Sequence, residues 1–226
     1  MSTVNIIIPI YNQADKIGKC LESIFKQTYR DFSVILVNDG STDNLTKEIL
    51  PWQNKIKIIN QQNRGASAAR NAGAKMATAK FLLFCDADIV MKPKMLEKMV
   101  KELDKHAGAA YVYSSFRFGI KSFKLWPFDA VKLKTMPYIH TTSLLRREKF
   151  PGFDENLKRF QDWDLWLTLL EKGETGVWLP EILFKIKSGG TMSHWLPSFA
   201  YRLFKSNKKV ITYNSALRVI KQKHHL

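Results

Sequence analysis

Residues 81–88 read Phe-Leu-Leu-Phe-Cys-Asp-Ala-Asp, a short apolar run that ends at two carboxylates, Asp86 and Asp88. A run of this length predicts a buried strand. In an open α/β sheet, ligands bind at the carboxyl ends of the strands, so we expect both carboxylates at the mouth of a crevice. Hard oxygen ligands of this kind suit Mg²⁺ or Mn²⁺, with substrate phosphates completing the coordination. The alternative is an acidic turn that only closes a core strand.

The chain before this run alternates strand-length apolar segments with helix-length amphipathic segments. The pattern predicts strands at residues 4–10, 32–37 and 55–60, and helices at 15–27, 41–50 and 68–77. A strand–helix rhythm of this kind predicts an α/β fold, with a Rossmann-like, mostly parallel sheet flanked by helices.

The pattern becomes less regular after the central run. We expect a helix from Pro93 to about residue 103, strands at 109–114 and 141–146, and a helix over 162–171. Residues 116–137 alternate basic with aromatic side chains. This composition suits a mobile loop or hairpin over a site, or equally a basic surface segment with a few aromatic anchors.

The composition sets limits on the class of protein. With 226 residues, the chain is long enough for one domain with a short appendage. Its 36 Lys and Arg against 20 Asp and Glu give a net charge of +16, which predicts attraction to an anionic partner. We find neither a span-length apolar segment nor an amino-terminal secretion signal, and we therefore expect a cytoplasmic protein. The two cysteines, Cys20 and Cys85, are expected to be buried thiols.

Residues 195–226 differ from the rest of the chain, because they contain no Asp or Glu and interleave basic with apolar side chains. We therefore divide the chain into a domain at 1–194 and a basic amphipathic helical segment at 195–226. Such a segment predicts peripheral attachment to an anionic membrane surface, here the inner face of the cell membrane. The alternative is helices that pack on the domain and expose a basic face.

Several motifs together resemble the family 2 glycosyltransferases, which have the GT-A fold. Over roughly residues 3–193, the matching stretches are Pro9-Ile10-Tyr11-Asn12, Val37-Asn38-Asp39-Gly40-Ser41-Thr42-Asp43, Asn63-Arg64-Gly65 with Ala69-Arg70-Asn71-Ala72-Gly73, Asp86-Ala87-Asp88, Gly152-Phe153-Asp154-Glu155 and Gln161-Asp162-Trp163-Asp164-Leu165-Trp166. Each motif alone is weak, but six in the family's order are specific.

The resemblance implies a role for each matching residue. Pro9, Tyr11, Asp39, Arg70 and Asp86 would bind the donor nucleotide, with Tyr11 and Asp39 on the base and Arg70 on the diphosphate or ribose. Asp88 and Asp86 would hold the Mg²⁺ or Mn²⁺ ion.

For the acceptor side, the resemblance makes Asp162 the general base and places Gln161, Trp163 and Asp164 at the acceptor or a secondary site. Three positions depart from the family's pattern. Gln161 replaces a glutamate, and Asn38 replaces the first of two aspartates. The usual carboxyl-terminal histidine is missing, which leaves Lys187 and His194 as alternative diphosphate contacts.

We therefore expect an inverting, metal-assisted glycosyltransferase that moves a sugar from a nucleotide-diphosphate sugar, with UDP favoured, to a hydroxyl of a glycan or lipid-linked glycan. Two alternatives stay open. A non-catalytic basic module would explain the charge but not the carboxylates at successive strand ends. A sugar-nucleotide nucleotidyltransferase would also use a parallel sheet and a metal ion. However, the loop after the first strand lacks the glycine-rich sequence with which such an enzyme would grip phosphates. We expect no nucleic acid partner.

Overall fold

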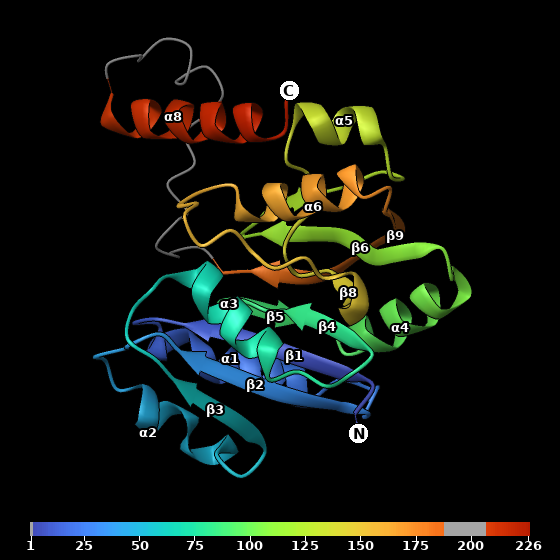
Figure 1. Ribbon diagram of the computed structural model, residues 1–226. Helices are drawn as coiled ribbons and strands as arrows, with labels where there is room; N and C mark the ends of the chain where they lie inside the picture. Colours follow the sequence, from blue (N-terminus) through green and yellow to red (C-terminus); the bar gives the residue numbers. More distant parts are fainter. Residues whose placement is uncertain (1, 188–206) are drawn as a thin grey trace.

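The computed structural model describes residues 2–187 and 207–226 of the chain (Figure 1). In chain order, the strands are β1 (Val4–Ile10), β2 (Phe32–Asn38), β3 (Ile56–Asn60), β4 (Phe81–Phe84), β5 (Ile89–Met91), β6 (Ala109–Phe118), β7 (Lys121–Phe123), β8 (Leu144–Arg146) and β9 (Thr175–Ile186). The α-helices are α1 (Ala14–Phe25), α2 (Leu45–Ile49), α3 (Ala66–Lys75), α4 (Met95–Lys105), α5 (Ala130–Thr135), α6 (Gln161–Glu171) and α8 (Lys208–Lys223), with 3₁₀ turns η1 (Leu50–Trp52) and η2 (Arg147–Lys149).

Within the described ranges, nine strands form one sheet, whose order is β3-β2-β1-β4-β8-β6-β9-β5 with β7 paired to β6. The four strands β3, β2, β1 and β4 are parallel, as the sequence predicts. The other half is mixed, because β8 runs antiparallel to both β4 and β6 whereas β9 runs parallel to β6. The fold is therefore α/β, with a mixed sheet flanked by helices.

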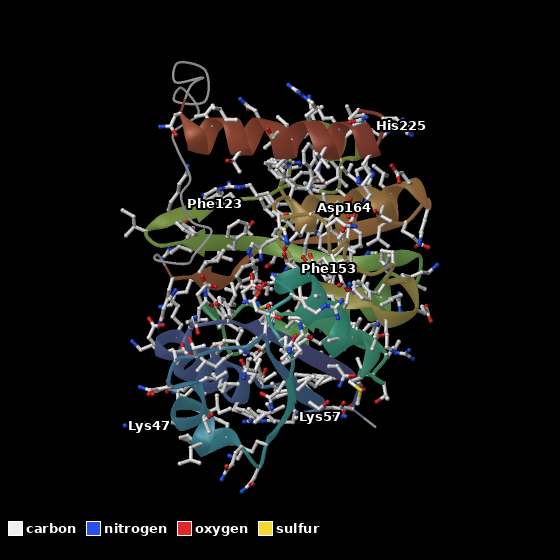
Figure 2. The ribbon with its side chains drawn as sticks, turned by 60° about the vertical axis from the view of Figure 1, so that its left-hand side comes forward. Lys47, Lys57, Phe123, Phe153, Asp164 and His225 are labelled. Carbon is white, nitrogen blue, oxygen red and sulfur yellow. The ribbon has the colours of Figure 1, made fainter. Side chains whose placement is uncertain are left out.

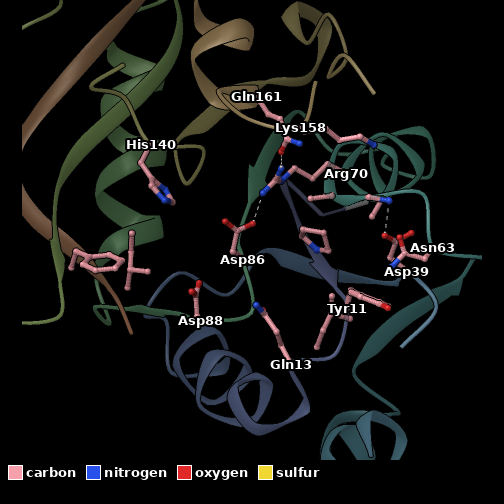
Figure 3. A pocket seen from close by; sticks show the side chains of 17 residues that line it. Tyr11, Gln13, Asp39, Asn63, Arg70, Asp86, Asp88, His140, Lys158 and Gln161 are labelled. Atoms are coloured by element: carbon pink, nitrogen blue, oxygen red, sulfur yellow. Dashed lines mark hydrogen bonds and ion pairs between the residues drawn. The ribbon is translucent and has the colours of Figure 1, made fainter. Parts of the chain in front are cut away.

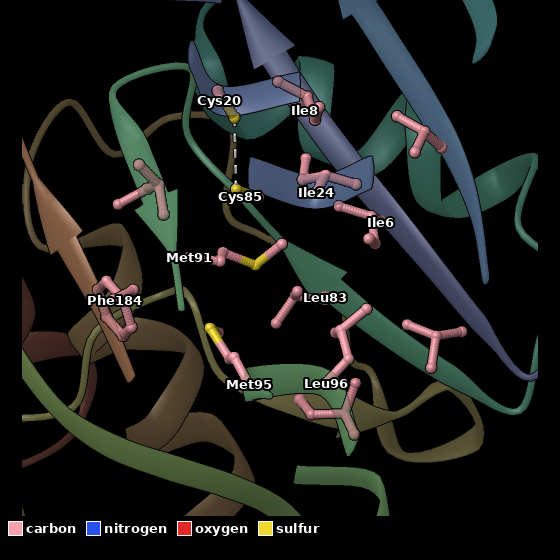
Figure 4. Packing of buried hydrophobic residues seen from close by; sticks show 14 of the residues in the cluster. Ile6, Ile8, Cys20, Ile24, Leu83, Cys85, Met91, Met95, Leu96 and Phe184 are labelled. Carbon is pink, nitrogen blue, oxygen red and sulfur yellow. Dashed lines mark hydrogen bonds between the residues drawn. The ribbon is translucent and has the colours of Figure 1, made fainter. Parts of the chain in front are cut away.

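The two faces of the sheet bury separate hydrophobic cores because side chains alternate along each strand. Ile6 and Ile8 of β1 point to one core, which α1, α2 and α4 cover, while Ile7 points to the other, which α3, α5 and α6 cover. Figure 4 shows part of the first core, where Cys20 and Cys85 lie with their sulfur atoms 3.8 Å apart. Both thiols are fully buried, which confirms the expectation for the cysteines.

Helix α3 lies very close to the sheet because its residues are small. A Cβ atom added at Gly73 would lie 2.4 Å from Cγ2 of Ile7, which is closer than real contacts allow. Asn71, on the same helix, exchanges hydrogen bonds with the backbone of Phe153: its Nδ2 donates to the carbonyl oxygen and its Oδ1 accepts from the N–H. The turn at residues 152–155 is therefore attached to the helix that carries Arg70.

The sequence pattern did not predict strands β5 and β9 and left the β6–β7 hairpin as one alternative; all three lie in the less regular part of the chain after β4. Strand β5 is short, and β9 contains Pro180 and pairs with β6 through register shifts, so neither shows a regular alternation of apolar residues. Residues 116–123 form a β6–β7 hairpin, whose turn contains Gly119 at φ 55°. A hairpin is therefore found at these residues, and its Phe116 and Phe123 rings stack on each other, as the alternative with aromatic anchors also expects.

The described part of the carboxyl-terminal segment is helix α8, which lies beside α6 (Figure 1). Ile220 is fully buried in the core beneath it, while Ile211 and Val219 are about half exposed. Packing against the domain, the alternative from the sequence, therefore holds for this helix. The predicted boundary at 194/195 lies outside the described residues. Among those that are described, no helix is long and apolar enough to span a bilayer.

Candidate active site

The carboxyl ends of β1, β2 and β4 surround a pocket of about 510 Å³ (Figure 3). The site lies at the topological switch point, because the chain leaves β1 in one direction along the sheet to reach β2 and β3 and returns past it to reach β4. The lining residues are Pro9, Ile10, Tyr11, Gln13, Asp39, Asn63, Gly65, Ala66, Ala69, Arg70, Asp86, Asp88, Phe118, His140, Lys158, Gln161 and Ile186. All five residues expected to bind the donor nucleotide are among them, as is Asp88.

Tyr11 and Asp39 form one end of this pocket with Asn63 (Figure 3). The Tyr11 side chain is exposed, and an exposed aromatic ring at a pocket rim offers a flat surface for stacking. Asp39 is buried, and its carboxylate accepts hydrogen bonds from the backbone N–H groups of Arg64 and Gly65 and from Nε2 of Gln61. Asp39 therefore holds the loop before α3 in place at the pocket edge.

Arg70 connects the centre of the pocket to the start of α6. It is buried, and its Nη2 lies 2.6 Å from Oδ1 of Asp86, while its Nη1 donates to Oε1 of Gln161 at 3.1 Å. Both terminal nitrogens thus bond within the protein, while Nε has no hydrogen-bond partner among the described residues. The expected contact of Arg70 with the donor diphosphate or ribose stays a prediction. Gln161 uses its amide oxygen here in place of the family's glutamate. Arg70 holds the first turn of α6 beside the end of β4.

The two aspartates after β4 differ in their electrostatic surroundings. Burial would raise the pKa of Asp86, but the positive charge of Arg70, the charge of His140 and the hydrogen bond from Arg70 together hold this pKa below its usual value. Burial and the negative charge of Asp86 raise the pKa of Asp88 to about 6. The ionised form of Asp88 is therefore short of compensating positive charge.

This donor set fits a divalent cation that binds together with a phosphate-bearing ligand. A cation would neutralise the charge that Asp88 carries when ionised. No group of three or more His, Cys, Asp or Glu side chains that could hold a metal exists in the described part of the chain. An ion held by Asp88 and Asp86 would therefore take its other ligands from the donor diphosphate and water, which is common for Mg²⁺.

Asp162 lies in the first turn of α6, close enough to His140 and Arg70 to interact with both electrostatically. Its Oδ1 accepts the backbone N–H of Trp163 at 2.9 Å. Burial raises the pKa of Asp162, although the positive charges of His140 and Arg70 oppose this change. A carboxylate with a raised pKa is a stronger base than a fully solvated one.

His140 also lines the pocket, although it belongs to none of the sequence motifs. Its Nδ1 accepts the backbone N–H of Thr142 at 3.0 Å, and its ring contacts Phe116 and Phe184, with both centroid distances 5.3 Å. Burial lowers the pKa of His140 even though the carboxylates of Asp86 and Asp162 favour its charged form. The only available sequence signal was a histidine directly before a polar Thr-Thr-Ser run at the start of a predicted strand.

Of the two candidate diphosphate contacts, Lys187 and His194, the structure describes only Lys187. The backbone N–H of Lys187 donates to the carbonyl oxygen of Asp88 at 3.0 Å, which places Lys187 beside the pocket. Burial and the positive charge of Lys19 lower the pKa of its ammonium group. His194 lies outside the described residues. Lys158, an exposed lysine outside the sequence motifs, also lines the pocket.

Trp163 and Asp164 do not face this pocket, and we correct their assignment to an acceptor site. Trp163 is fully buried, and its Nε1 donates to the carbonyl oxygen of Leu133. Asp164 is buried on the side of α6 that faces α8 (Figure 2), where its Oδ1 lies 2.8 Å from both Nε2 of His224 and Nζ of Lys223. Asp164 thus anchors the carboxyl-terminal helix.

An open α/β sheet with polar side chains gathered at its switch point is an architecture that binds ligands at this edge in many enzymes. The model of the family described as Glycosyl transferase family 2 matches residues 5–163, so the chain belongs to this family of sugar-transferring enzymes. Family membership decides against a nucleotidyltransferase.

Several curated relatives are named glycosyltransferases. The putative glycosyltransferase EpsE of Bacillus subtilis is 29% identical over 201 residues, which cover 81% of this chain and 72% of EpsE. The chondroitin synthase of Pasteurella multocida is 32% identical over 184 residues, which cover 76% of this chain. The chain spans only 19% of that synthase, and the match to the uncharacterized glycosyltransferase YibD of Escherichia coli spans 29% of YibD.

Solved structures show the same fold. TarS of S. aureus has a TM-score of 0.71 at 22% identity, with 83% of this chain and 61% of that chain covered. The mannosyltransferase PcManGT of Pyrobaculum calidifontis, solved with GDP-Man and Mn²⁺, has a TM-score of 0.67 at 19% identity, with 96% of this chain and 64% of that chain covered. These likenesses confirm the GT-A-like fold that the sequence predicts.

Proposed function

We propose that the protein transfers a sugar from a UDP-sugar to a hydroxyl group of a glycan, with inversion at the anomeric carbon. The observation that carries this proposal is the arrangement around Arg70, which joins Asp86 at the end of β4 to the first turn of α6. A donor diphosphate near Asp86 and Asp88 and a base on α6 would then lie on opposite sides of one sugar. Structures of TarS with UDP and with UDP-GlcNAc support UDP as the nucleotide.

In the proposed reaction, the acceptor hydroxyl oxygen bonds to the anomeric carbon, and the bond from that carbon to the diphosphate oxygen breaks. Asp162 accepts the hydroxyl proton, and UDP leaves with the electron pair of the broken bond. Attack from the face opposite the leaving group inverts the configuration. The raised pKa of Asp162 suits this role, because a base works best when its pKa lies near the operating pH.

Other side chains hold the donor. Tyr11 stacks on the base, and Asp39 shapes the loop that receives it; Asp39 also has lone-pair capacity for an imide N–H. Lys187, whose backbone N–H bonds to the carbonyl oxygen of Asp88, interacts with Lys19, and an anionic diphosphate nearby would relieve the repulsion between the two ammonium groups. A Mg²⁺ or Mn²⁺ ion held by Asp88 and Asp86 would neutralise charge on the leaving diphosphate; the Mn²⁺ present in the PcManGT structure supports this assignment.

Release of UDP tests the proposal directly. The protein should liberate UDP slowly from at least one member of a UDP-sugar panel in the presence of Mn²⁺, because water can replace the missing acceptor, and faster when a glycan acceptor is added. Coupled detection of UDP measures the rate. A protein that binds UDP-sugars but never releases UDP, with any acceptor tested, would instead be a binding module.

We further propose that the acceptor is lipid-linked and that residues 195–226 attach the enzyme to an anionic membrane at the cytoplasmic face. The described helix α8 leaves Ile211, Arg218, Val219 and Lys221 exposed although it packs on the domain. Apolar and basic side chains on one exposed surface favour binding to an anionic interface. Attachment through α8 would then hold the donor site close to the membrane that carries the lipid-linked acceptor.

Replacing both Arg218 and Lys221 by Glu should lower binding to anionic vesicles by at least roughly 30-fold, because each basic residue near an anionic surface contributes about 1 kcal/mol. Sedimentation with vesicles containing phosphatidylserine measures the bound fraction. The matched control replaces Lys101 and Lys105 of α4 by Glu, with the same charge change at exposed positions. Equal sedimentation of both variants and the wild type would limit α8 to packing.

A further inference from the structure

Five contacts hold the His140 side chain and its loop in one orientation. The Ile139 carbonyl oxygen accepts Nε1–H of Trp166, and the His140 carbonyl oxygen accepts the hydroxyl of Ser143. The ring packs against Phe116 and Phe184 on its sides, and Nδ1 accepts the backbone N–H of Thr142. Nε2 has no such restraint from the residues that the structure describes.

The contact with Thr142 also determines which ring nitrogen carries the proton. A nitrogen that accepts an N–H must be unprotonated, so the neutral ring carries its hydrogen on Nε2. Figure 3 shows this ring directed into the pocket from the side opposite Tyr11 and Asp39. Among the residues that the structure describes, we find no acceptor for Nε2–H. The pocket therefore contains a fixed hydrogen-bond donor that no described part of the protein uses.

The position of His140 identifies the ligand group that it faces. Tyr11 and Asp39 lie at the nucleotide end of the pocket, and Asp86 and Asp88 lie in the middle, where the diphosphate is proposed (Figure 3). His140 is close enough to both Asp86 and Asp162 to interact with them electrostatically. The group located between the diphosphate and the base is the sugar that is transferred.

We propose that His140 donates a hydrogen bond from Nε2 to a hydroxyl oxygen of the transferred sugar and so contributes to the choice of donor. The proposal rests on the proposed function, because it requires a UDP-sugar in this pocket. Phe118 and Ile186 also line the pocket and pair across β6 and β9 two residues beyond the rings that contact His140, so they offer apolar contact to the C–H groups of a sugar ring. A sugar whose hydroxyl at this position is missing would leave Nε2–H unpaired in a buried site, which weakens binding.

Two substitutions separate the sugar contact from the structural contact. In His140→Asn, the amide oxygen can take the place of Nδ1 as acceptor for Thr142, but no N–H reaches the position of Nε2. In His140→Gln, the longer side chain can place an N–H near the position of Nε2. The first variant therefore keeps the loop contact and loses the proposed sugar contact, and the second does the reverse.

The affinities for UDP and for UDP-GlcNAc, and for each other UDP-sugar of the panel, are measured for wild type and both variants, with melting temperatures. We expect UDP affinity within about twofold of wild type in both variants. The ratio of UDP-sugar to UDP affinity should fall roughly 5–10-fold in His140→Asn and much less in His140→Gln for the sugar that wild type prefers. UDP release should fall roughly 10–100-fold in His140→Asn, because a misplaced sugar reacts slowly.

An unchanged ratio in His140→Asn would overturn the proposal. Equal losses in both variants, with lower melting temperatures and weaker UDP binding, would also overturn it by showing that His140 only supports the loop. If wild type binds UDP and UDP-sugars yet the variants match it, the inference fails while the proposed function stands. If wild type binds no UDP-sugar at all, the proposed function itself fails, and the inference with it.

Discussion

Asp162→Asn is expected to bind UDP as the wild type does and to transfer sugar roughly 10²–10⁴-fold more slowly, which is the usual contribution of a positioned base. The amide keeps the shape of the side chain and its contact with the N–H of Trp163, but it cannot accept a proton from the acceptor hydroxyl. Calorimetry with UDP and single-turnover transfer measure the two quantities on the same preparation.

Asp164→Asn is the matched control, because it makes the same change two residues further along α6. Its carboxylate is buried between His224 and Lys223, so we expect a lower melting temperature with turnover close to wild type. The substitution weakens the contacts that hold α8 on α6, although Lys223 keeps Asp154 and His224 keeps Glu171 as partners, and it does not touch the pocket at the sheet edge. Near-normal turnover in Asp162→Asn together with collapse in Asp164→Asn would move the base to Asp164.

UDP is expected to bind at least roughly 10²-fold more weakly in EDTA than with Mn²⁺, because the diphosphate and the Asp86/Asp88 pair otherwise face each other as like charges. Two such charges about 4 Å apart repel by about 4 kcal/mol at an effective dielectric constant of about 20. In Asp88→Asn, the affinity should become nearly independent of Mn²⁺. Titration calorimetry with and without the metal checks both statements.

The metal-dependent part of this affinity should depend on pH in a definite direction. Because the pKa of Asp88 is raised to about 6, its carboxyl group gains a proton as the pH falls through 6, and a protonated carboxyl group is a poor metal ligand. Mn²⁺ should therefore strengthen UDP binding more at pH 7.5 than at pH 5. Asp104→Asn, which removes an exposed carboxylate paired with Lys80, serves as the control and should retain the full metal and pH dependence. Equal UDP affinity in EDTA and Mn²⁺ for the wild type would exclude the metal role.

The parallel half of the fold and the carboxylates at its edge were predictable because the responsible signals are local. A buried strand shows as a short apolar run, and the polar residues that follow it, such as Asp39 and Asp86, must lie at the edge where the strand ends. Parallel neighbours bring these edges together without further information. The order of motifs along the chain therefore already indicated the end of the pocket that we propose for the donor nucleotide.

The mixed half of the sheet was less predictable, since β5 is short and β9 is irregular around Pro180. Strands of this kind are stabilised by their pairing with β6 and by tertiary packing more than by their own pattern. The same reason explains why Trp163 was misassigned, because a tryptophan in a helix looks the same in the sequence whether it faces a ligand or a core.

The contacts of Asp164 and His140 depend on residues that are distant in the chain or on one specific loop geometry. Asp164 meets His224, which lies 60 positions away, and nothing near either residue indicates this pair. His140 becomes a fixed donor only because Thr142 occupies Nδ1 and two aromatic rings from β6 and β9 hold the imidazole. A residue pattern carries the periodicity of strands and helices, but the direction of a single polar side chain is set by the packing of elements that the chain brings together only when it folds.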